Sequence, residues 1–144
     1  MITRETDYAL RALLCLATRG QGQVIATSAM AEEMDIPYRF LRRILQKLHV
    51  AGLVGSSRGK TGGVWLRPDP ASLSLRDVVF HVDPSTVTLN ACLIDGTACN
   101  RVSRCVVHDE LVRVQAILEH ELSTTTLAEL VQREKDRQTD MVKG

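Results

Sequence analysis

The sequence predicts a mainly α-helical fold with one small β-hairpin, and three observations lead to this prediction. Apolar residues make up 44% of the 144 residues and aromatic residues only 3%, so the core must be built from Leu, Val, Ile and Ala. Apolar residues recur at helical spacing through most of the chain. Only after Gly52 does the pattern change, to two short β-type runs around a glycine-rich turn.

The first two helices are marked by their terminal residues. The first is expected to run from Thr3, a suitable N-cap, to Gly20, a helix stop. Its apolar residues, such as Leu13, lie three or four positions apart. A second helix is expected to begin near Thr27 or Ser28.

The third helix follows the turn MDIP, starts at Pro37 and ends at Gly52. Its expected buried stripe consists of Phe40, Leu41, Ile44, Leu45 and Leu48. Its basic residues project from the other faces, and they are Arg39, Arg42, Arg43 and Lys47. Two helices joined by a short turn, the second of them basic on its outer face, predict a helix-turn-helix.

The β-hairpin completes a winged helix-turn-helix. LVGSS and VWLR are expected to form two strands around the basic turn RGKTGG. In such a fold the third helix reads the major groove of double-stranded DNA, while the wing lies along the backbone or in a minor groove. The expected DNA-contacting residues are Thr27, Ser28, Tyr38, Arg39, Arg42, Arg43, Lys47, Arg58, Lys60 and Thr61.

The charge distribution agrees with a polyanionic partner. The formal net charge is only +1, but residues 1–68 carry ten Lys/Arg against five Asp/Glu. Residues 69–144 carry eight against twelve. The segment from Ile36 to Arg67 holds seven basic residues and no acidic one, which favours binding to phosphates over an ordinary solvated face.

The rest of the chain predicts helices around one irregular segment. A short helix, SLRDVVFHV, is expected to be capped by Ser74, and a long one to run from His108 to Leu122. Apolar residues of the long helix alternate in three- and four-residue steps, which suits a partner helix in a dimer or, alternatively, packing on its own domain. The last helix, TTLAELVQREKDRQ, is expected to fray into a polar tail. We therefore divide the chain into a winged-helix domain (1–82), a cysteine-rich loop (83–107) and a dimerisation helix with a C-terminal helix or tail (108–144).

Three of the four cysteines gather in the irregular segment. Cys15 lies on the apolar face of the first helix, where a lone cysteine is usually a small buried hydrophobe. Cys92, Cys99 and Cys105 fall within fourteen residues, and His108 follows three positions later. The chain lacks a signal-peptide layout and a long apolar run, so we expect a cytoplasmic protein without membrane contact, in which clustered thiols bind metal or act in redox chemistry. The spacing favours an iron–sulfur cluster slightly over zinc held by three cysteines and a histidine.

The chain resembles the Rrf family of bacterial winged-helix transcription regulators almost end to end. The matching stretches are TDYALRALLCLA, IPYRFLRRILQKLHVAGLV, SSRGKTGGVWL, the three cysteines and TTLAELV. The resemblance implies a homodimer crossed through the long helix, with Cys92, Cys99 and Cys105 as ligands of an iron–sulfur cluster. In one group of the family the histidine that matches His108 completes a 2Fe-2S site. In another, an acid that matches Asp7 reaches the 4Fe-4S cluster of the partner chain. The spacing of Cys92 and Cys99, one residue wider than in both groups, leaves the cluster type open, and His108 is the preferred fourth ligand.

The sequence therefore predicts a DNA-binding transcriptional repressor whose operator affinity is controlled by an iron–sulfur cluster that senses redox state, nitric oxide or iron and cluster status. One alternative is a cluster-free winged-helix regulator that depends on thiol redox chemistry or zinc. A second is an electron-transfer or cluster-carrier protein without DNA binding, against which the basic segment argues. The histidines have no nucleophile or carboxylate partner at a telling spacing, so no enzymatic activity is expected.

Overall fold

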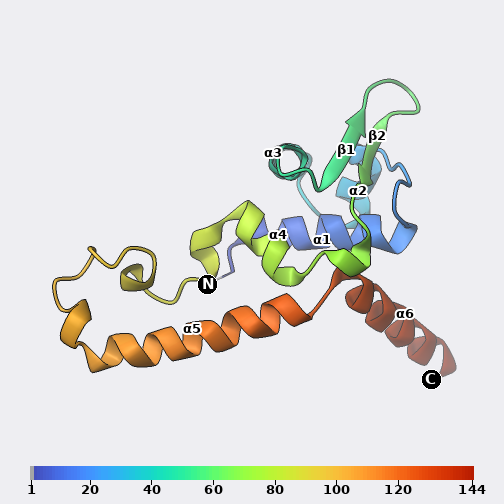
Figure 1. The fold of residues 1–144 in the computed structure, drawn as a ribbon. Helices are drawn as coiled ribbons and strands as arrows, with labels where there is room; N and C mark the ends of the chain where they lie inside the picture. Colours follow the sequence, from blue (N-terminus) through green and yellow to red (C-terminus); the bar gives the residue numbers. More distant parts are fainter. Residues whose placement is uncertain (1) are drawn as a thin grey trace.

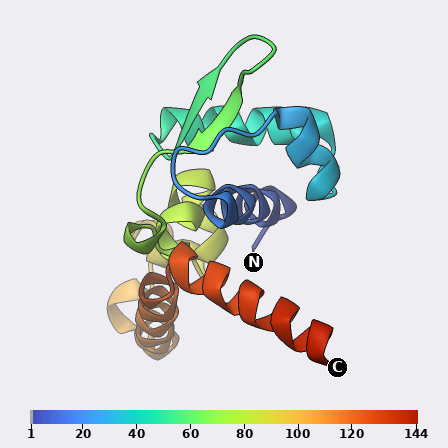
Figure 2. The ribbon, with the colours of Figure 1, turned by 90° about the vertical axis from the view of Figure 1, so that its right-hand side faces the viewer.

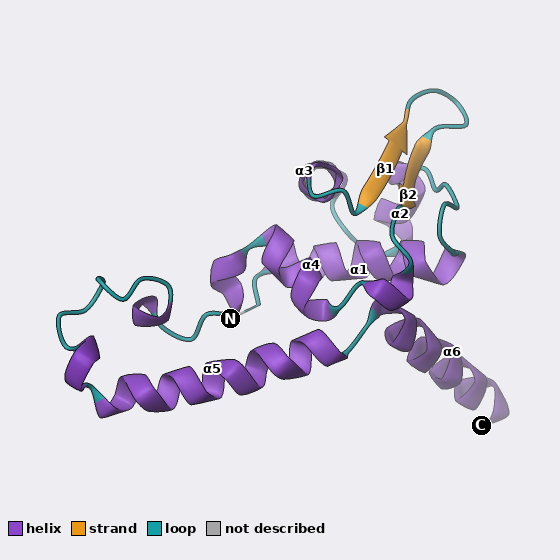
Figure 3. Ribbon diagram, in the orientation of Figure 1, coloured by secondary structure: helices purple, strands orange, loops and turns teal. Residues whose placement is uncertain are grey.

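A computed structural model describes residues 2–144, and in them it contains six α-helices and one two-stranded antiparallel sheet (Figures 1 and 3). The elements are α1 (Arg4–Arg19), α2 (Thr27–Glu33), α3 (Tyr38–Val50), β1 (Val54–Ser57), β2 (Gly63–Leu66), η1 (Pro70–Ser72), α4 (Leu75–Val82), η2 (Pro84–Val87), η3 (Ala91–Leu93), η4 (Val102–Arg104), α5 (Val106–Thr124) and α6 (Leu127–Lys143), where η denotes a short 3-10 helix. The mainly helical, winged helix-turn-helix prediction is confirmed.

Helix α1 is the centre of the core, and both of its predicted ends are correct. The Thr3 side chain accepts a hydrogen bond from the Thr6 backbone N–H at 3.3 Å, which satisfies one of the free donors of the first turn. At the other end Gly20 adopts φ 107°, a left-handed conformation that glycine enters without steric cost. The helix buries one side against α3, α4 and α6.

Helices α2 and α3 form the helix-turn-helix. The turn between them places Asp35 at φ 52°, and Ile36 is then buried in the core. Helix α3 is anchored by four fully or almost fully buried side chains, Leu41, Ile44, Leu45 and Leu48. The prediction for Phe40 is wrong: its side chain is 50% exposed, and the Arg43 guanidinium lies over its ring, 5.6 Å from the centroid. Phe40 lies at the edge of the apolar stripe, where periodicity does not separate buried from exposed positions.

The wing is fixed to the body by close backbone contacts. Strands β1 and β2 pair with Val54 opposite Leu66 and Gly55 opposite Trp65. The chain before α2 adds a third pairing, because Ile25 and Val64 exchange two backbone hydrogen bonds of 2.9 Å. A Cβ atom on Gly63 would lie 2.1 Å from the Ile25 carbonyl oxygen, so only glycine allows this approach.

Helices α4 and α6 begin side by side. Each has a capping box, Ser74 with Asp77 in α4 and Thr126 with Glu129 in α6. The two N-caps form an isolated antiparallel bridge, in which Leu75 N–H donates to the Thr125 carbonyl and Leu127 N–H to the Leu73 carbonyl, both at 2.9 Å. This bridge ties the junction of α5 and α6 to the winged-helix body.

Helix α5 projects along one side of the molecule and buries none of its own residues (Figure 1). It begins two residues before the predicted start and ends two after the predicted end. Helix α6 leaves the end of α5 in a different direction (Figure 2) and packs on α1 through the buried Leu127 and Val131. The predicted frayed tail is wrong, since the helix continues to Lys143. Among residues 2–144, no helix combines the length and the apolar character that crossing a bilayer requires.

Candidate DNA-binding surface and cysteine loop

The outer side of α3 is polar and exposed because its other side is held in the core. The apolar residues that anchor the helix recur every three or four positions, so the positions between them point outward. The exposed polar residues of this surface are Tyr38, Arg39, Arg42, Arg43, Gln46 and Lys47. Most of them line a shallow depression on the outer face of the helix.

A groove separates α3 from the wing and brings together three residues that the sequence predicts as DNA contacts. Thr27 of α2, Arg42 of α3 and Arg58 of the wing all line it. The ring of His49 joins the two sides, because its Nδ1 donates a hydrogen bond of 3.2 Å to the Val54 carbonyl oxygen of β1. The groove has the donors and the positive charge that a DNA phosphate backbone requires.

The remaining predicted contacts surround this groove. Ser28 is exposed in the first turn of α2, and Lys60 and Thr61 are exposed in the wing turn. Within residues 2–144, neither Arg58 nor Lys60 forms an ion pair or hydrogen bond. Their charges are therefore available to an external anion.

Two of the predicted α3 contacts are partly engaged within the chain. The Lys47 ammonium lies 2.9 Å from Glu5 Oε1, and Arg43 Nε lies 3.9 Å from the same oxygen. Glu5 is on α1, so this pairing links the first helix to the recognition helix. Part of the Lys47 charge is thereby neutralised, which makes this residue a weaker candidate for DNA contact than Arg42.

The cysteine loop, defined here as residues 88–108, lies at the end of α5 that is far from α6 (Figure 1). Cys92 is half-buried in η3, Cys99 is exposed, and Cys105 is the half-buried N-cap of α5. His108 Nδ1 lies 3.4 Å from the Cys92 Sγ. The structure thus brings one thiol and the imidazole together, whereas within residues 2–144 it assembles no group of three His, Cys, Asp or Glu side chains that could hold a metal ion.

The alternative fourth ligand has a partner of its own. Asp7 forms an ion pair of 2.8 Å with Arg11 one turn later on α1, and both side chains are 45% exposed. An exposed ion pair contributes little stabilising free energy in water, so it would not prevent Asp7 from contacting a second chain.

One face of α5 carries a series of contacts from the cysteine loop to α4. His108, Gln115 and Glu119 are separated by seven and four residues, so they lie on the same side of the helix. The Gln115 amide accepts from the Leu89 N–H and donates to the Val87 carbonyl, both at 3.0 Å. Gln115 therefore fastens the start of the cysteine loop to the middle of α5.

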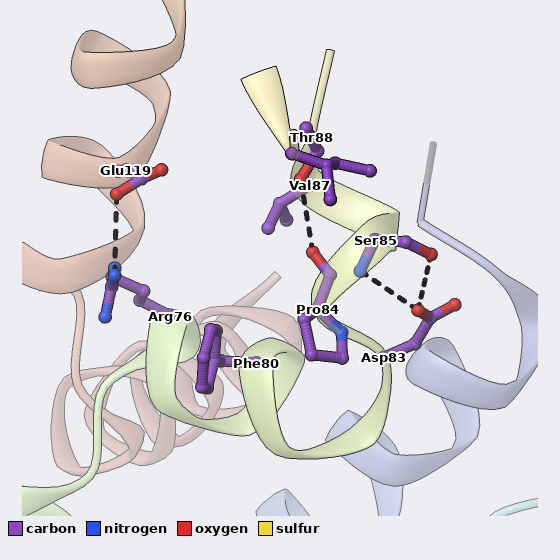
Figure 4. A pocket seen from close by; sticks show the side chains of 9 residues that line it. Arg76, Phe80, Asp83, Pro84, Ser85, Val87, Thr88 and Glu119 are labelled. Atoms are coloured by element: carbon purple, nitrogen blue, oxygen red, sulfur yellow. Dashed lines mark hydrogen bonds and ion pairs between the residues drawn. The ribbon is translucent and has the colours of Figure 1, made fainter. Parts of the chain in front are cut away.

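The last contact of this face lies in a small pocket between α4, η2 and α5 (Figure 4). Arg76 of α4 reaches Glu119 of α5 with an N–O distance of 3.4 Å, and its guanidinium lies 5.7 Å from the Phe80 ring centroid. Asp83 accepts hydrogen bonds from Ser85, which together with Thr86 hold the pKa of its carboxyl below the usual value. These bonds fix the turn that carries the chain from α4 toward the cysteine loop.

Cys15 is separate from the other cysteines. It is 3% exposed, and burial together with the nearby Glu33 carboxylate raises the pKa of its thiol to about 11. The Sγ lies 3.8 Å from Glu33 Oε1, and Glu33 also pairs with Arg19. This thiol is neutral at physiological pH, in keeping with the packing role expected from the sequence.

Sequence reasoning missed several of these functional candidates. Gln46 and His49 line the groove beside α3, but neither carries a fixed charge that marks it in the sequence. Gln115 contacts residues 26 and 28 positions away in the sequence, and Arg76 contacts a residue 43 positions away. Sequence spacing carries no signal for contacts over such separations. Only the amide of Gln46, placed on the outer side of a predicted recognition helix, could have been identified beforehand.

A recognition helix beside a basic wing, carried on a helical core, defines a winged-helix DNA-binding protein. Comparison with known proteins then gives the family. Residues 2–133 match the Rrf2 family, described as an iron-dependent transcriptional regulator. The chain belongs to this family of transcription regulators.

Solved structures of other proteins have the same fold. IscR of T. potens is 22% identical and superposes with a TM-score of 0.77, covering 96% of this chain and 90% of that one. CymR of B. subtilis, titled a global cysteine regulator, is 22% identical with a TM-score of 0.73, over 92% and 97% of the two chains. The oxidized form of S. aureus CymR is 25% identical with a TM-score of 0.70, over 91% and 95%.

Proposed function

We propose that this regulator binds operator DNA as a homodimer and that an iron–sulfur cluster held by Cys92, Cys99, Cys105 and His108 sets its operator affinity. The observation that carries the proposal is the approach of His108 to Cys92 in a loop that contains two further thiols. The same loop is joined to the DNA-binding body through α5.

The donor set fits an iron–sulfur cluster. Cluster iron is held by thiolates, and imidazole replaces thiolate in some clusters. All three loop thiols are free, and Cys99 is exposed, so the segment between η3 and α5 has room to bring Cys99 and Cys105 toward the Cys92–His108 pair. When bound, such a cluster supplies a redox-active centre whose iron and sulfide react with oxidants and nitric oxide.

The apolar residues of α5, none of which is fully buried in the single chain, support the homodimer. A 19-residue helix with no buried side chain is unusual unless a partner covers it. Its apolar residues follow a coiled-coil-like pattern at Val107, Leu111, Val114, Leu118 and Leu122. A second copy of α5 offers the matching surface, and two DNA-binding domains would then face successive major grooves of a palindromic operator.

The route from the loop to the DNA follows the contacts on the adjoining side of α5, where His108, Gln115 and Glu119 lie. Ordering of the loop around Cys92 and His108 fixes the first turn of α5. Gln115 holds the helix to residues 87–89, and Glu119 holds it to Arg76. Helix α4 in turn packs against α1 and α3, so a change in its position reaches the recognition helix.

The free-energy difference that this control of operator affinity requires is small. A tenfold change in operator affinity corresponds to about 1.4 kcal/mol of differential stabilisation between the two states of the loop. A few hydrogen bonds and one partly exposed ion pair are of this order.

A cluster-free thiol or zinc regulator is the second candidate. The approach of a thiol to an imidazole also suits redox chemistry at Cys92, and the similarity to an oxidized CymR structure agrees with it. Anaerobic purification distinguishes the candidates. Iron and acid-labile sulfide in the protein, with absorption and Mössbauer spectra of a cluster, support the first proposal, and a colourless protein that contains zinc or no metal contradicts it. Gel shifts of the loaded and metal-free forms then measure the effect on DNA affinity.

A further inference from the structure

The polar residues on the outer side of α3 differ in how far they are already engaged. Lys47 and Arg43 share the Glu5 carboxylate of α1. In contrast, the side chains of Arg42 and Gln46 form no hydrogen bond or ion pair with the rest of the described chain, residues 2–144. Binding DNA would cost neither of these two side chains an internal contact.

Arg42 and Gln46 form one surface. They are four residues apart, so their side chains lie one above the other on the helix. Both line the groove toward the wing, and both line the depression on the outer face of α3. Gln46 lies on the opposite side of the helix from the buried stripe that contains Leu41 and Leu48, so it points directly away from the core.

The chemistry of Gln46 differs from that of its neighbours. The arginine and lysine side chains of α3 only donate hydrogen bonds, which suits guanine and phosphate. The carboxamide of Gln46 both donates and accepts. It therefore matches the N7 acceptor and the N6 donor that adenine presents together in the major groove.

We propose that Gln46 is a specificity-determining residue that reads an adenine in each half of the operator, with Arg42 reading a guanine close to it. Four residues span about 6 Å along a helix, and base pairs are stacked about 3.4 Å apart, so the two purines lie within about two base pairs of each other. The inference rests on the proposed DNA binding and adds the base that this position recognises.

Selection of duplexes from a randomised pool tests the inference, with the full-length protein and its Gln46→Ala and Gln46→Glu variants. The native protein is expected to select, in each half-site, one adenine within about two base pairs of a guanine. Gln46→Ala should lose the adenine and keep the other positions. Gln46→Glu should select cytosine at that position, because a carboxylate accepts from the cytosine N4 amino group. Gln138→Ala, which removes an exposed glutamine of α6, is the matched control and should leave the selected sequence unchanged.

A modified operator gives a second measurement that needs only the native protein. Replacing the selected adenine by 7-deazaadenine removes the N7 acceptor and should weaken binding by roughly tenfold. Gln46→Ala should bind the modified and unmodified duplexes equally. Thus the inference is tested even if Gln46→Ala lowers overall affinity.

The outcomes separate this inference from the proposed function. A native protein that selects a defined site, with a Gln46→Ala variant that selects the same adenine, overturns the role of Gln46 and leaves DNA binding intact. If 7-deazaadenine weakens binding of the native protein and of Gln46→Ala equally, the role of Gln46 is likewise overturned and DNA binding is unaffected. A native protein that selects no sequence overturns both the role of Gln46 and sequence-specific operator binding.

Discussion

His108 Nδ1 lies 3.4 Å from the Sγ of Cys92, although the two residues are sixteen positions apart in the sequence. Cys105, which is only three residues from His108, caps the same helix. Cys105 and His108 thus lie within the first turn at one end of α5, and His108 also contacts Cys92. Binding of a cluster would require Cys99 and Cys105 to move toward the Cys92–His108 pair.

This relationship predicts which residue is the fourth ligand. His108→Ala should alter or abolish the absorption and Mössbauer spectra of anaerobically purified protein, because it removes the imidazole beside Cys92. Asp7→Ala should leave the spectra unchanged, since it breaks only an exposed ion pair with Arg11. The opposite pattern would assign the site to an acid that reaches across the dimer.

A second prediction concerns communication through α5. Gln115→Ala should leave the cluster spectrum unchanged and reduce the ratio of operator affinities between the loaded and metal-free forms, because residues 87–89 are no longer fastened to the helix. Glu110→Ala is the control. It removes an exposed pair with Arg113 on a different face of α5 and should keep the ratio. An unchanged ratio in Gln115→Ala would exclude this route.

DNA binding should distinguish the base-reading helix from the wing. Arg42→Ala is expected to cost about 1–3 kcal/mol on the selected operator, whereas Arg43→Ala should cost less because Glu5 already compensates part of its charge. Lys60→Ala should weaken specific and non-specific binding alike and lower the salt dependence by about one counterion. These values can be measured by fluorescence anisotropy at several salt concentrations. Unchanged affinity in an Arg42/Arg43 double alanine variant would remove α3 from its proposed role.

Assembly should depend on the apolar face of α5. Val114 is 41% exposed in the single chain, so Val114→Glu costs little there and places a charge in the proposed helix–helix contact. We expect this variant to sediment as a monomer and to lose most operator affinity. Arg113→Glu, an exposed change outside the apolar face, should remain dimeric. A dimeric Val114→Glu protein would place the contact elsewhere.

The thiols should fall into two classes. In metal-free protein at pH 8, Cys92, Cys99 and Cys105 should react quickly with a thiol reagent, while Cys15 should react only after unfolding. Its pKa of about 11 keeps Cys15 in the neutral thiol form, and the thiolate is the reactive species. Mass spectrometry of the labelled peptides identifies the sites, and rapid labelling of Cys15 would show that the junction of α1 and α2 opens readily.

The sequence predicted those parts of the fold that depend on local signals. Thr3, Gly20 and Ser74 act within one turn of their own positions, and the structure confirms all three. Burial at the margin of a stripe depends on neighbouring elements, and Phe40 was wrong for this reason. The continuation of α6 to Lys143 was also missed, because polar composition was taken as a sign of fraying.

The residues of the candidate site could be predicted from the sequence, but the contacts between them could not. Clustered cysteines and a one-sided charge are visible in the sequence. The pairing of Lys47 with Glu5 joins positions 42 residues apart, and no periodicity connects them. The attachment of the cysteine loop to α5 through Gln115 is likewise a property of the folded chain.

The bridge between Ser74 and Thr126 makes α5 a lever with a fixed pivot. From Thr124 the helix extends about 27 Å to Val106, while Glu119 is only about 7.5 Å from the pivot. A displacement of about 2 Å at the cysteine end would therefore move Glu119 by about 0.6 Å, with a correspondingly greater force on Arg76. A large displacement of the cysteine loop is thereby converted into a small displacement of α4. A close-packed core can transmit a small displacement of this kind.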